Sequence, residues 1–276
     1  MNGIILINAF SGIGEHQAKR LNEEFSALGY DVPIVKNLPQ DIPDNIDFCI
    51  FLDKDIYTAR ALENKGVRLF NSAKSIELCD DKMLTYLALQ GKVNEPLTIS
   101  FSFTYLESEV REEELEYIIS TLSLPLVMKI NKHSRGEGVF LVHSKEELKE
   151  LISKYRTTPH LYQKYISYSK GRDTRVIVVG GKVVASMERM NDSDFRSNVE
   201  QGGKTHVVEL SDYARNVAEK VSKVLGLDYC GVDLLTDEKG EVYVCEVNSN
   251  AFFKGIEGAT GVNVARSYVE NVLKFL

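Results

Sequence analysis

Three oxygen-bearing side chains near the end of the chain could bind a metal ion together. Glu246 and Asn248 are two residues apart in an apolar run, so they face the same side of a strand. If the turn before that strand takes four residues, Asp233 lies opposite Val244 and is a diagonal neighbour of Glu246, ~7–8 Å away. Carboxylate and amide oxygens are ligands that Mg²⁺ takes, together with waters and substrate phosphates. The spacing alone fits a solvent-facing polar stripe equally well.

A lysine and a glycine-containing loop form a second candidate site. Lys129 lies near the end of an apolar run, and the polar loop after it contains Ser134, Gly136 and Gly138. A lysine at a strand end can reach a phosphate, and glycines let backbone N–H groups approach phosphate oxygens. The spacing is not that of a P-loop. Taken alone, the segment fits a mobile surface loop better than a phosphate site.

Arginines recur around a predicted hairpin and the polar loop that follows it. Arg175 opens one apolar run, Arg189 ends the next, and Gly180-Gly181 joins the two runs. Guanidinium groups bind phosphates and carboxylates through paired hydrogen bonds. We expect Arg172 to be solvated, so Arg175 and Arg189 are the better candidates for contact with a ligand.

The elements that must position these side chains can be predicted from periodicity. The first seventy residues alternate short apolar runs with segments of helical spacing, which predicts a parallel sheet. Strands are expected over 4–8, 32–35, 48–52 and 67–70, and helices over 15–28 and 56–65. The loop Ser11–Gly14 lacks the third glycine of a dinucleotide-binding turn, so we interpret it as a plain turn.

The remainder of the chain mixes strands and helices without a repeat or a proline-rich linker. A helix is expected within 71–91, another within 106–122, one that begins after the capping box at Ser144, and two more over 211–225 and 262–275. Strands are expected over 126–130, 139–142, 160–166, 175–179, 182–188, 229–236 and 241–248. The segment 191–204 has few apolar residues and is expected to be a long loop, of the kind that often carries function.

Composition excludes several classes of protein. The chain has 276 residues, a formal net charge of −7 and four cysteines without a C-x-x-C pair. Such a charge does not favour a general nucleic-acid binder, and the cysteine spacing favours reduced thiols over zinc ligands. No apolar run is long enough for a membrane span, and the first residues lack the basic region of a secretory signal. We therefore expect a cytoplasmic protein without nucleic-acid or membrane partners.

Taken in order along about the last two hundred residues, these motifs resemble the ATP-grasp superfamily and, within it, the RimK/LysX-like amino-acid ligases. The resemblance rests on the tracts 71–82, 171–175, 195–198 with Gly202-Gly203, and 231–249. It implies an ATP-grasp fold of mixed α/β and α+β class. An N-terminal Rossmann-like lobe over residues 1–72 would precede a nucleotide lobe over 73–166 and a C-terminal lobe over 167–276, and the last two would clasp ATP.

The resemblance also implies a role for each candidate residue. Arg175 and Arg189 would be catalytic and face an acyl phosphate and the substrate carboxylate. Asp233, Glu246 and Asn248 would bind Mg²⁺, two ions being expected and Mn²⁺ being an alternative. The residues expected to contact ATP are Lys82, Lys129, Ser134, Gly136, Gly138, Gln163, Lys164, Tyr165, Ile166, Asp173, Arg196 and Asn198.

The implied reaction is ATP-dependent formation of an amide from a carboxylate and an amino-acid amine, through an acyl phosphate. The carboxylate could belong to a small molecule or a peptide, and a homo-oligomer stays open. The sequence departs from the family at Lys164, in the hinge that would contact the adenine or ribose. It also departs at Glu200-Gln201 and 250–254, near the expected acceptor site, which makes ribosomal-protein glutamylation a less favoured assignment. Two alternatives remain: a nucleotide-binding module without catalysis, and an oxidoreductase that binds a dinucleotide at Gly12 and Gly14.

Overall fold

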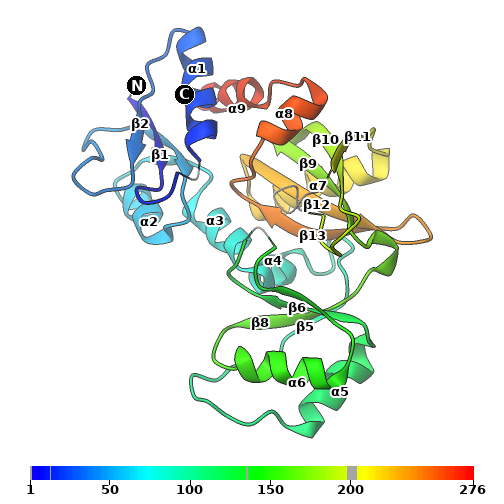
Figure 1. Ribbon diagram of the computed structural model, residues 1–276. Helices are drawn as coiled ribbons and strands as arrows, with labels where there is room; N and C mark the ends of the chain where they lie inside the picture. Colours follow the sequence, from blue (N-terminus) through cyan, green and yellow to red (C-terminus); the bar gives the residue numbers. More distant parts are fainter. Residues whose placement is uncertain (1, 13, 135, 198–203) are drawn as a thin grey trace.

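The computed structural model describes residues 2–12, 14–134, 136–197 and 204–276. Within them lie a four-stranded sheet near the N-terminus, a second four-stranded sheet in the middle and a five-stranded sheet near the C-terminus. Figure 1 shows the middle sheet and its helices at one end of the molecule, below the other two. The mixed α/β class predicted from the sequence is confirmed.

The N-terminal lobe is a parallel sheet in the order β2-β1-β3-β4. All side chains of β1 and β3 are buried, as expected for central parallel strands that are covered on both faces. The elements are β1 (Gly3–Ile7), α1 (Glu15–Ala27), β2 (Ile34–Lys36), β3 (Phe48–Leu52), α2 (Ile56–Asn64) and β4 (Arg68–Phe70). The predicted alternation is correct, with boundaries that differ by one or two residues.

Two short helices connect the first sheet to the rest. The sequence predicted a helix within 71–91, and the structure has α3 (Ala73–Asp80) and α4 (Lys82–Leu89). The break falls at Asp81, whose side chain accepts hydrogen bonds from the first N–H groups of α4. Ile76 of α3 packs in the core of the N-terminal lobe, whereas Leu89 of α4 packs with the C-terminal sheet. The boundary between lobes predicted at residue 72 remains a prediction, and these helices contact both sides of it.

The middle lobe is an antiparallel sheet in the order β5-β8-β6-β7. Helices α5 and α6 pack on it through one apolar cluster. The Ser144 hydroxyl accepts a hydrogen bond from the Glu147 N–H, as the capping box predicts. The elements are β5 (Thr98–Ile99), α5 (Glu112–Leu122), β6 (Leu126–Ile130), β7 (Val139–Val142), α6 (Lys145–Lys154) and β8 (His160–Lys164).

The C-terminal lobe is an antiparallel sheet in the order β11-β10-β9-β12-β13. Helix α7 covers one face, and α8, α9 and part of the N-terminal lobe pack on the other. The elements are η1 (Ser167–Ser169), β9 (Arg172–Val179), β10 (Lys182–Met190), β11 (Lys204–Val207), α7 (Asp212–Leu225), β12 (Tyr229–Thr236), β13 (Val242–Asn248), α8 (Lys254–Thr260) and α9 (Val264–Leu273). The sequence reasoning missed β5, β11 and α8.

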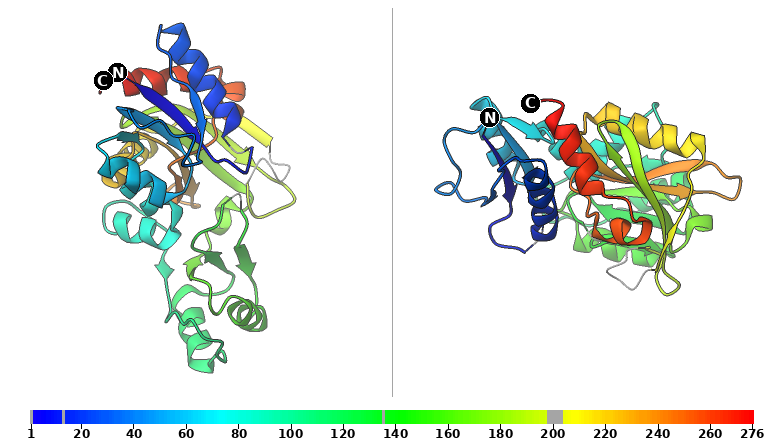
Figure 2. Two further views of the ribbon diagram at one scale, coloured as in Figure 1. Left: turned by 90° about the vertical axis from the view of Figure 1, so that its left-hand side faces the viewer. Right: turned by 90° about the horizontal axis from the view of Figure 1, so that it is seen from above.

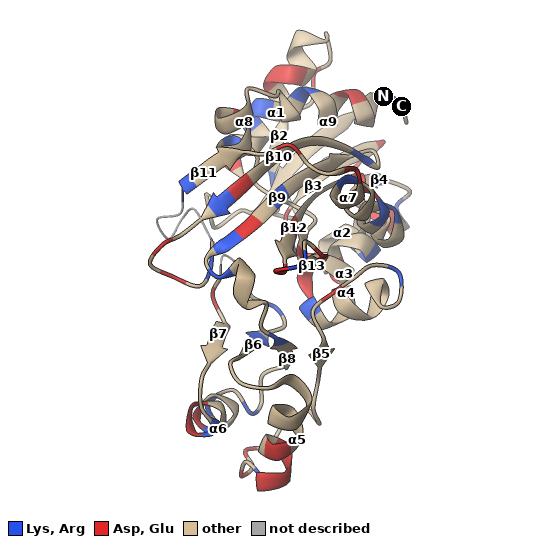
Figure 3. Ribbon diagram, turned by 90° about the vertical axis from the view of Figure 1, so that its right-hand side faces the viewer, with Lys and Arg blue, Asp and Glu red and all other residues tan. Residues whose placement is uncertain are grey.

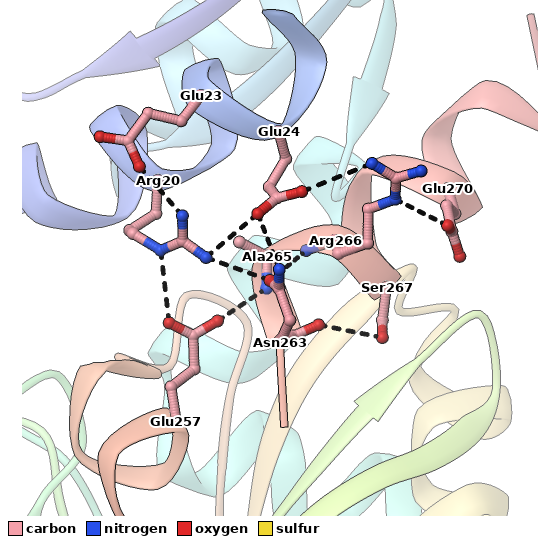
Figure 4. A network of polar contacts seen from close by, with 9 residues as sticks. All are labelled: Arg20, Glu23, Glu24, Glu257, Asn263, Ala265, Arg266, Ser267 and Glu270. Carbon is pink, nitrogen blue, oxygen red and sulfur yellow. Dashed lines mark hydrogen bonds and ion pairs between the residues drawn. The ribbon is translucent and has the colours of Figure 1, made fainter. Parts of the chain in front are cut away.

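A polar network fixes the N-terminal lobe against the C-terminal helices. Arg20 of α1 donates hydrogen bonds to Glu24 and Asn263, and its Nε lies 3.5 Å from Glu257 of α8. Arg266 of α9 completes the network at 3.6 Å from Glu24 (Figure 4). The first and third lobes are therefore held together, while the middle lobe projects away from both (Figure 2).

Candidate active site

The metal-binding trio of the sequence analysis comes together on one face of the C-terminal sheet. The register pairs Asp233 of β12 directly with Glu246 of β13, and Gly231 with Asn248. The predicted pairing of Asp233 with Val244 is wrong for two reasons. The turn is one residue longer than assumed, so that Thr236 pairs with Val242, and a β-bulge between Asp233 and Leu234 shifts the register by one more residue. The bulge lets Val244 join the apolar cluster under α7 while Glu246 faces the opposite side, so the two carboxylates are closer than a diagonal pair.

Two arginines from β9 and β10 complete this face. Asp233 lies opposite Arg175, and Asp173 lies opposite Arg189, in the register of β9 with its neighbours. Arg175 Nη2 donates to Asp233 Oδ2 at 2.7 Å, and Arg175 Nε also binds Oδ1. Figure 3 shows acidic and basic segments side by side on β9 and β10.

Arg189 bridges the two aspartates. Its Nη2 lies 2.5 Å from Asp173 Oδ2 and 2.9 Å from Asp233 Oδ2, and Nε donates to Asp173 Oδ1 at 2.7 Å. The Ser197 hydroxyl donates a further hydrogen bond to Asp173 at 2.5 Å. Asp173, predicted to contact ATP, is thus buried and paired in this structure, and its contact with a nucleotide remains a prediction.

The charges of this cluster shift its pKa values in opposite directions. Burial opposes ionisation of Asp233, but Arg175 and Arg189 outweigh it and lower its pKa. Burial and repulsion by Asp233 raise the pKa of Asp173, although Arg189 attracts it. Burial would lower the pKa of Arg189, but the two aspartates raise it instead. The guanidinium groups are therefore held in place by carboxylates before any ligand is considered.

A narrow cleft between the middle and C-terminal lobes collects the candidate phosphate ligands. It is lined by Lys82 of α4, Lys129 and Gln163 of the middle sheet, and Glu246 of β13. Lys129 is only 7% exposed, and its Nζ lies 3.7 Å from Cys245 Sγ. Burial lowers the pKa of Lys82, attraction by Glu246 opposes this, and repulsion by Lys129 adds to it. Two ammonium groups and one carboxylate that are distant in sequence thus share one cleft.

The glycine loop lies against residues of both neighbouring lobes. Lys82 Nζ donates to the His133 carbonyl at 2.5 Å, and Arg196 Nη1 donates to the Gly136 carbonyl at 2.7 Å. Both Gly136 and Gly138 have positive φ, and a Cβ on Gly138 would lie 3.0 Å from the Cβ of Ile130. Ser134 is exposed at the tip of this loop. The loop is therefore placed over the lysine end of the cleft.

The predicted ATP contacts at 163–166 follow the cleft at the end of β8. Gln163 is buried and donates through Nε2 to the Thr98 hydroxyl at 2.8 Å. The Lys164 N–H donates to the Leu97 carbonyl at 2.8 Å, and its side chain is exposed. Tyr165 and Ile166 are half-buried. The predicted ligand Asn198, with Gly202-Gly203, lies outside the described residues.

The donor set at Glu246 fits a hard divalent cation. Within the described chain, the carboxylate of Glu246 has no hydrogen-bond or ion-pair partner, and Asn248 adds an amide oxygen two residues away on the same strand. Asp233 is ionised but is held by two arginines, with which a cation would compete. No group of three His, Cys, Asp or Glu side chains suited to a metal is found among the described residues, so the amide of Asn248 would be needed as the third ligand.

The match to a known family agrees with this geometry. The model of the RimK-like ATP-grasp domain matches residues 80–272. The chain belongs to the RimK-like ATP-grasp family. This membership does not support the dinucleotide-dependent alternative at Gly12 and Gly14.

Several similar proteins are named as glutamate ligases or as synthases of glutamate conjugates. Human beta-citrylglutamate synthase B is 39% identical over 216 residues, which cover 77% of this chain and 55% of that protein. Human N-acetylaspartylglutamate synthase A is 32% identical over 268 residues, which cover 96% of this chain and 65% of that protein. A probable alpha-L-glutamate ligase of Maridesulfovibrio salexigens is 35% identical over 220 residues, 78% of this chain and 70% of that protein. The RimK-like chain thus spans little more than half of the first relative.

Solved structures show the same fold. The D-alanine–D-alanine ligase of Bacillus anthracis complexed with ATP has a TM-score of 0.77 at 19% identity, covering 99% of this chain and 96% of that one. A RimK domain ATP-grasp protein of Sphaerobacter thermophilus has a TM-score of 0.73 at 19% identity, covering 98% and 99%. The three-lobed ATP-grasp fold predicted from the sequence is therefore confirmed.

Sequence reasoning missed several polar residues of the cleft, and Glu95 is the charged one among them. Glu95 lies in the segment that connects α4 to β5, and it lines the cleft together with Gln163. No motif surrounds it in the sequence, and its placement depends on contacts with two other strands. The only signal would have been an acidic residue next to Pro96 in a segment of few charges.

Proposed function

We propose that this RimK-like chain is an ATP-dependent ligase that joins a carboxylate to an amino-acid amine. The observation that carries the proposal is the arrangement of Lys82, Lys129 and Glu246 in one cleft, next to the arginine pair of the adjoining sheet face. Cationic groups at one end of a cleft suit the triphosphate of ATP, and a second set of arginines suits a carboxylate. The names of the relatives describe this type of reaction.

The proposed reaction has two steps. A carboxylate oxygen of the substrate attacks the γ-phosphorus of ATP, the bond to ADP breaks, and an acyl phosphate forms. The amine then attacks the acyl carbon, phosphate leaves, and the nitrogen loses a proton as the amide forms. The transferring phosphoryl group carries spread negative charge, so positioning and cationic stabilisation provide most of the catalysis.

The position of each candidate residue indicates which part of the reaction it would serve. Lys82 and Lys129 would hold the phosphates within the cleft, and the loop with Gly136 and Gly138 would cover them and exclude water. Arg175 and Arg189 are within the same sheet face as Glu246, where the acyl phosphate and the carboxylate would meet. Their aspartate partners hold the guanidinium groups in a fixed orientation, which lowers the entropy lost on binding.

Magnesium is proposed as the metal. Asp233, Glu246 and Asn248 would hold it, and it would neutralise charge on the β- and γ-phosphates. A related fold, the ATP-grasp ligase PsnB, has been solved with Mg and ADP. Two ions are expected, and Mn²⁺ is an alternative because it takes the same oxygen ligands.

L-glutamate is the amine that we propose to test first, because the curated relatives named above are glutamate ligases or synthases by name. Citrate and N-acetylaspartate are the matching carboxylates. The tracts 200–201 and 250–254, which depart from the family near the expected acceptor site, leave peptide acceptors open.

No helix in the described part of the chain is long and apolar enough to cross a membrane. A cytoplasmic enzyme, alone or as a homo-oligomer, remains the proposal.

An inactive nucleotide-binding module of the same fold is the second candidate. It is favoured only by the arginine pairs on Asp233, which would have to loosen for a cation to bind there. The test is a screen for ADP release with Mg²⁺-ATP, L-glutamate and a panel of citrate, N-acetylaspartate and short acidic peptides. An amide of the mass expected from one pair supports the ligase. ATP binding without ADP release for every pair would support the module.

A further inference from the structure

The segment that begins with β5 has the sequence pattern of a longer strand. From Thr98 to Tyr105, hydroxyl and apolar side chains alternate without exception, which is the period of a strand with one apolar face. Only Thr98 and Ile99 of this tract pair with a neighbouring strand, β8. Within the described chain, residues 100–105 make no backbone-to-backbone hydrogen bond. A segment with a strand pattern therefore leaves its peptide groups free.

This segment continues a strand at the edge of the middle sheet. The order β5-β8-β6-β7 puts β5 at the edge, and β8 is the only strand of the described chain that pairs with it. An edge strand with free N–H and C=O groups can pair with a strand of another molecule. Proteins usually protect such edges with charges or prolines, yet residues 98–106 contain neither. The edge is therefore suited to the addition of a strand.

The apolar side chains of this segment are exposed. The exposed fractions are 38% for Phe101, 42% for Phe103, 87% for Tyr105 and 75% for Leu106. Tyr117 of α5 is 52% exposed and extends the surface, because its ring centroid lies 5.9 Å from that of Phe101. Single exposed apolar residues are common, but a contiguous group is typical of an interaction site. We call residues 100–106 together with Tyr117 the aromatic edge.

The aromatic edge lies outside the candidate active site. Along β6 and β8, Lys129 and Gln163 line the cleft, whereas Met128 and Tyr162 pack in the apolar cluster that holds α5. Alternate residues of a strand point to opposite faces, so α5 covers the face of the sheet opposite the cleft. Tyr117 belongs to this helix, which Figure 1 shows at the lower end of the molecule. A partner bound at the aromatic edge would therefore leave the cleft open.

The charges next to the aromatic edge are mostly negative. Residues 107–116 include six glutamates and one arginine. Lys145 pairs with Glu112, and Arg156 pairs with Glu114. The glutamates of this tract that form no ion pair with another described residue are Glu107, Glu109, Glu113 and Glu116.

These charges indicate the chemistry of the partner. Carboxylates and the faces of aromatic rings both attract cations. Nucleic acids and anionic membranes would be repelled, and a second copy of this chain would bring the same acidic groups and a net charge of −7. We propose that the aromatic edge binds a basic, extended segment of another protein, which pairs with residues 100–105 as an added strand of the middle sheet. This inference does not depend on the proposed function.

A short peptide in which arginine alternates with valine is the probe for this surface. Its binding to the full chain is measured by calorimetry, and its position is located by amide hydrogen exchange. We expect residues 100–105 to exchange more slowly when the peptide is bound, because their N–H groups become hydrogen-bonded. A peptide with glutamate in place of arginine, and an arginine–valine peptide with N-methylated backbone amides, should each bind at least about tenfold more weakly.

Two double variants separate the apolar surface from the charge. Phe103→Ser with Tyr105→Ser removes two exposed rings, and Glu107→Lys with Glu113→Lys reverses two exposed charges. Each should weaken binding of the arginine–valine peptide about tenfold. The matched control, Asp31→Lys with Glu238→Lys, makes the same change of charge at exposed positions in the other two lobes and should bind like the wild type. Thermal unfolding checks the fold of every variant.

Several results would overturn the proposal. These are equal binding of the arginine and glutamate peptides, binding that survives N-methylation, or an equal loss in the control variant. Competition between the arginine–valine peptide and ATP would place the peptide in the cleft instead. If the wild type alone sediments as a dimer that Phe103→Ser with Tyr105→Ser dissociates, the aromatic edge binds a second copy of the chain, and the proposed basic partner is wrong.

Discussion

Asp233 and Glu246 face each other across β12 and β13, but only Asp233 is paired with arginines. Asp233 is 4% exposed and is bound by Arg175 and Arg189, whereas Glu246 has no hydrogen-bond or ion-pair partner among the described residues. Two carboxylates of the same predicted function therefore have different energetic roles in the free protein. Asp233 neutralises buried cations, and Glu246 is free to bind a ligand.

Substitution of the two carboxylates should separate stability from catalysis. Asp233→Asn leaves Arg175 without its carboxylate partner and leaves Arg189 with Asp173 alone, so we expect a loss of about 3–5 kcal/mol in the free energy of unfolding. Glu246→Gln should change it by less than about 0.5 kcal/mol. Urea unfolding without Mg²⁺ measures both. Equal losses in the two variants would contradict the pairing seen in the structure.

The same pairing predicts how stability depends on pH. The pKa of Asp233 is lowered in the folded protein, so its contribution is complete above its unfolded pKa of about 3.9 and is lost as the pH falls through the folded value. Below about pH 4, the wild type should therefore lose stability more steeply than Asp233→Asn. The free energy of unfolding is measured by urea for both proteins between pH 5 and pH 3. If it falls equally with pH in the wild type and in Asp233→Asn, Asp233 does not act in this way.

Glu246→Ala should abolish turnover while ATP still binds without Mg²⁺. Among the three proposed ligands, the carboxylate at this position would be the one able to contact both metal ions, and its removal also relieves repulsion with Asp233. Glu238→Ala is a matched control, because Glu238 is exposed in the turn of the same hairpin. ADP formation is compared for the two variants. Wild-type turnover in Glu246→Ala would remove this residue from the metal site.

Lys129→Met tests the phosphate end of the cleft. The substitution keeps the apolar stem and removes the charge, so ATP affinity should fall by about 1–3 kcal/mol if one charge-assisted hydrogen bond is lost. Lys132→Met removes an exposed lysine three residues away and should leave affinity unchanged. ATP affinity is measured by calorimetry for both variants. If Lys129→Met binds ATP as tightly as Lys132→Met does, Lys129 does not bind the phosphates and is a structural residue.

The glycine loop should couple ATP use to amide formation. The backbone at Gly138 has a positive φ of 66°, which side chains other than glycine rarely adopt, and an added Cβ would also crowd Ile130. Gly138→Ala should therefore displace the loop. The expected result is more ADP formed per amide, because water then reaches the acyl phosphate. Gly240→Ala is the control, since Gly240 has a φ of 82° but open space around it. Unchanged coupling in Gly138→Ala would make the loop a passive connection.

The parts of the fold with strong local signals were predictable. Helix α7 has Ser211 as its N-cap and Gly226 in the left-handed conformation at its end, and the predicted bounds agree with the structure. By contrast, α8 contains two glycines in seven residues and β5 has only two residues, so neither has a periodic pattern. Their conformations depend on packing against other elements.

The site was predictable in its residue types but not in its pairings. Spacing placed Glu246 and Asn248 on one face, but the bulge that brings Asp233 opposite Glu246 has no local sequence signal. Similarly, Arg189 could be identified as a candidate, but its bridge between Asp173 and Asp233 requires the order of three strands. Glu95 could not be found at all, because only the meeting of two lobes places it in the cleft.

The transfer of oxygen from the carboxylate substrate to phosphate tests the central claim most directly. Once the screen has found a reactive pair, its carboxylate is labelled with ¹⁸O and incubated with Mg²⁺-ATP, the amine and the enzyme, and the released phosphate is analysed by mass. An acyl phosphate intermediate leaves one carboxylate oxygen on the phosphate, so labelled phosphate should appear in proportion to the amide. Amide formed with unlabelled phosphate would contradict the acyl phosphate mechanism, and no amide with any pair would contradict the ligase assignment itself.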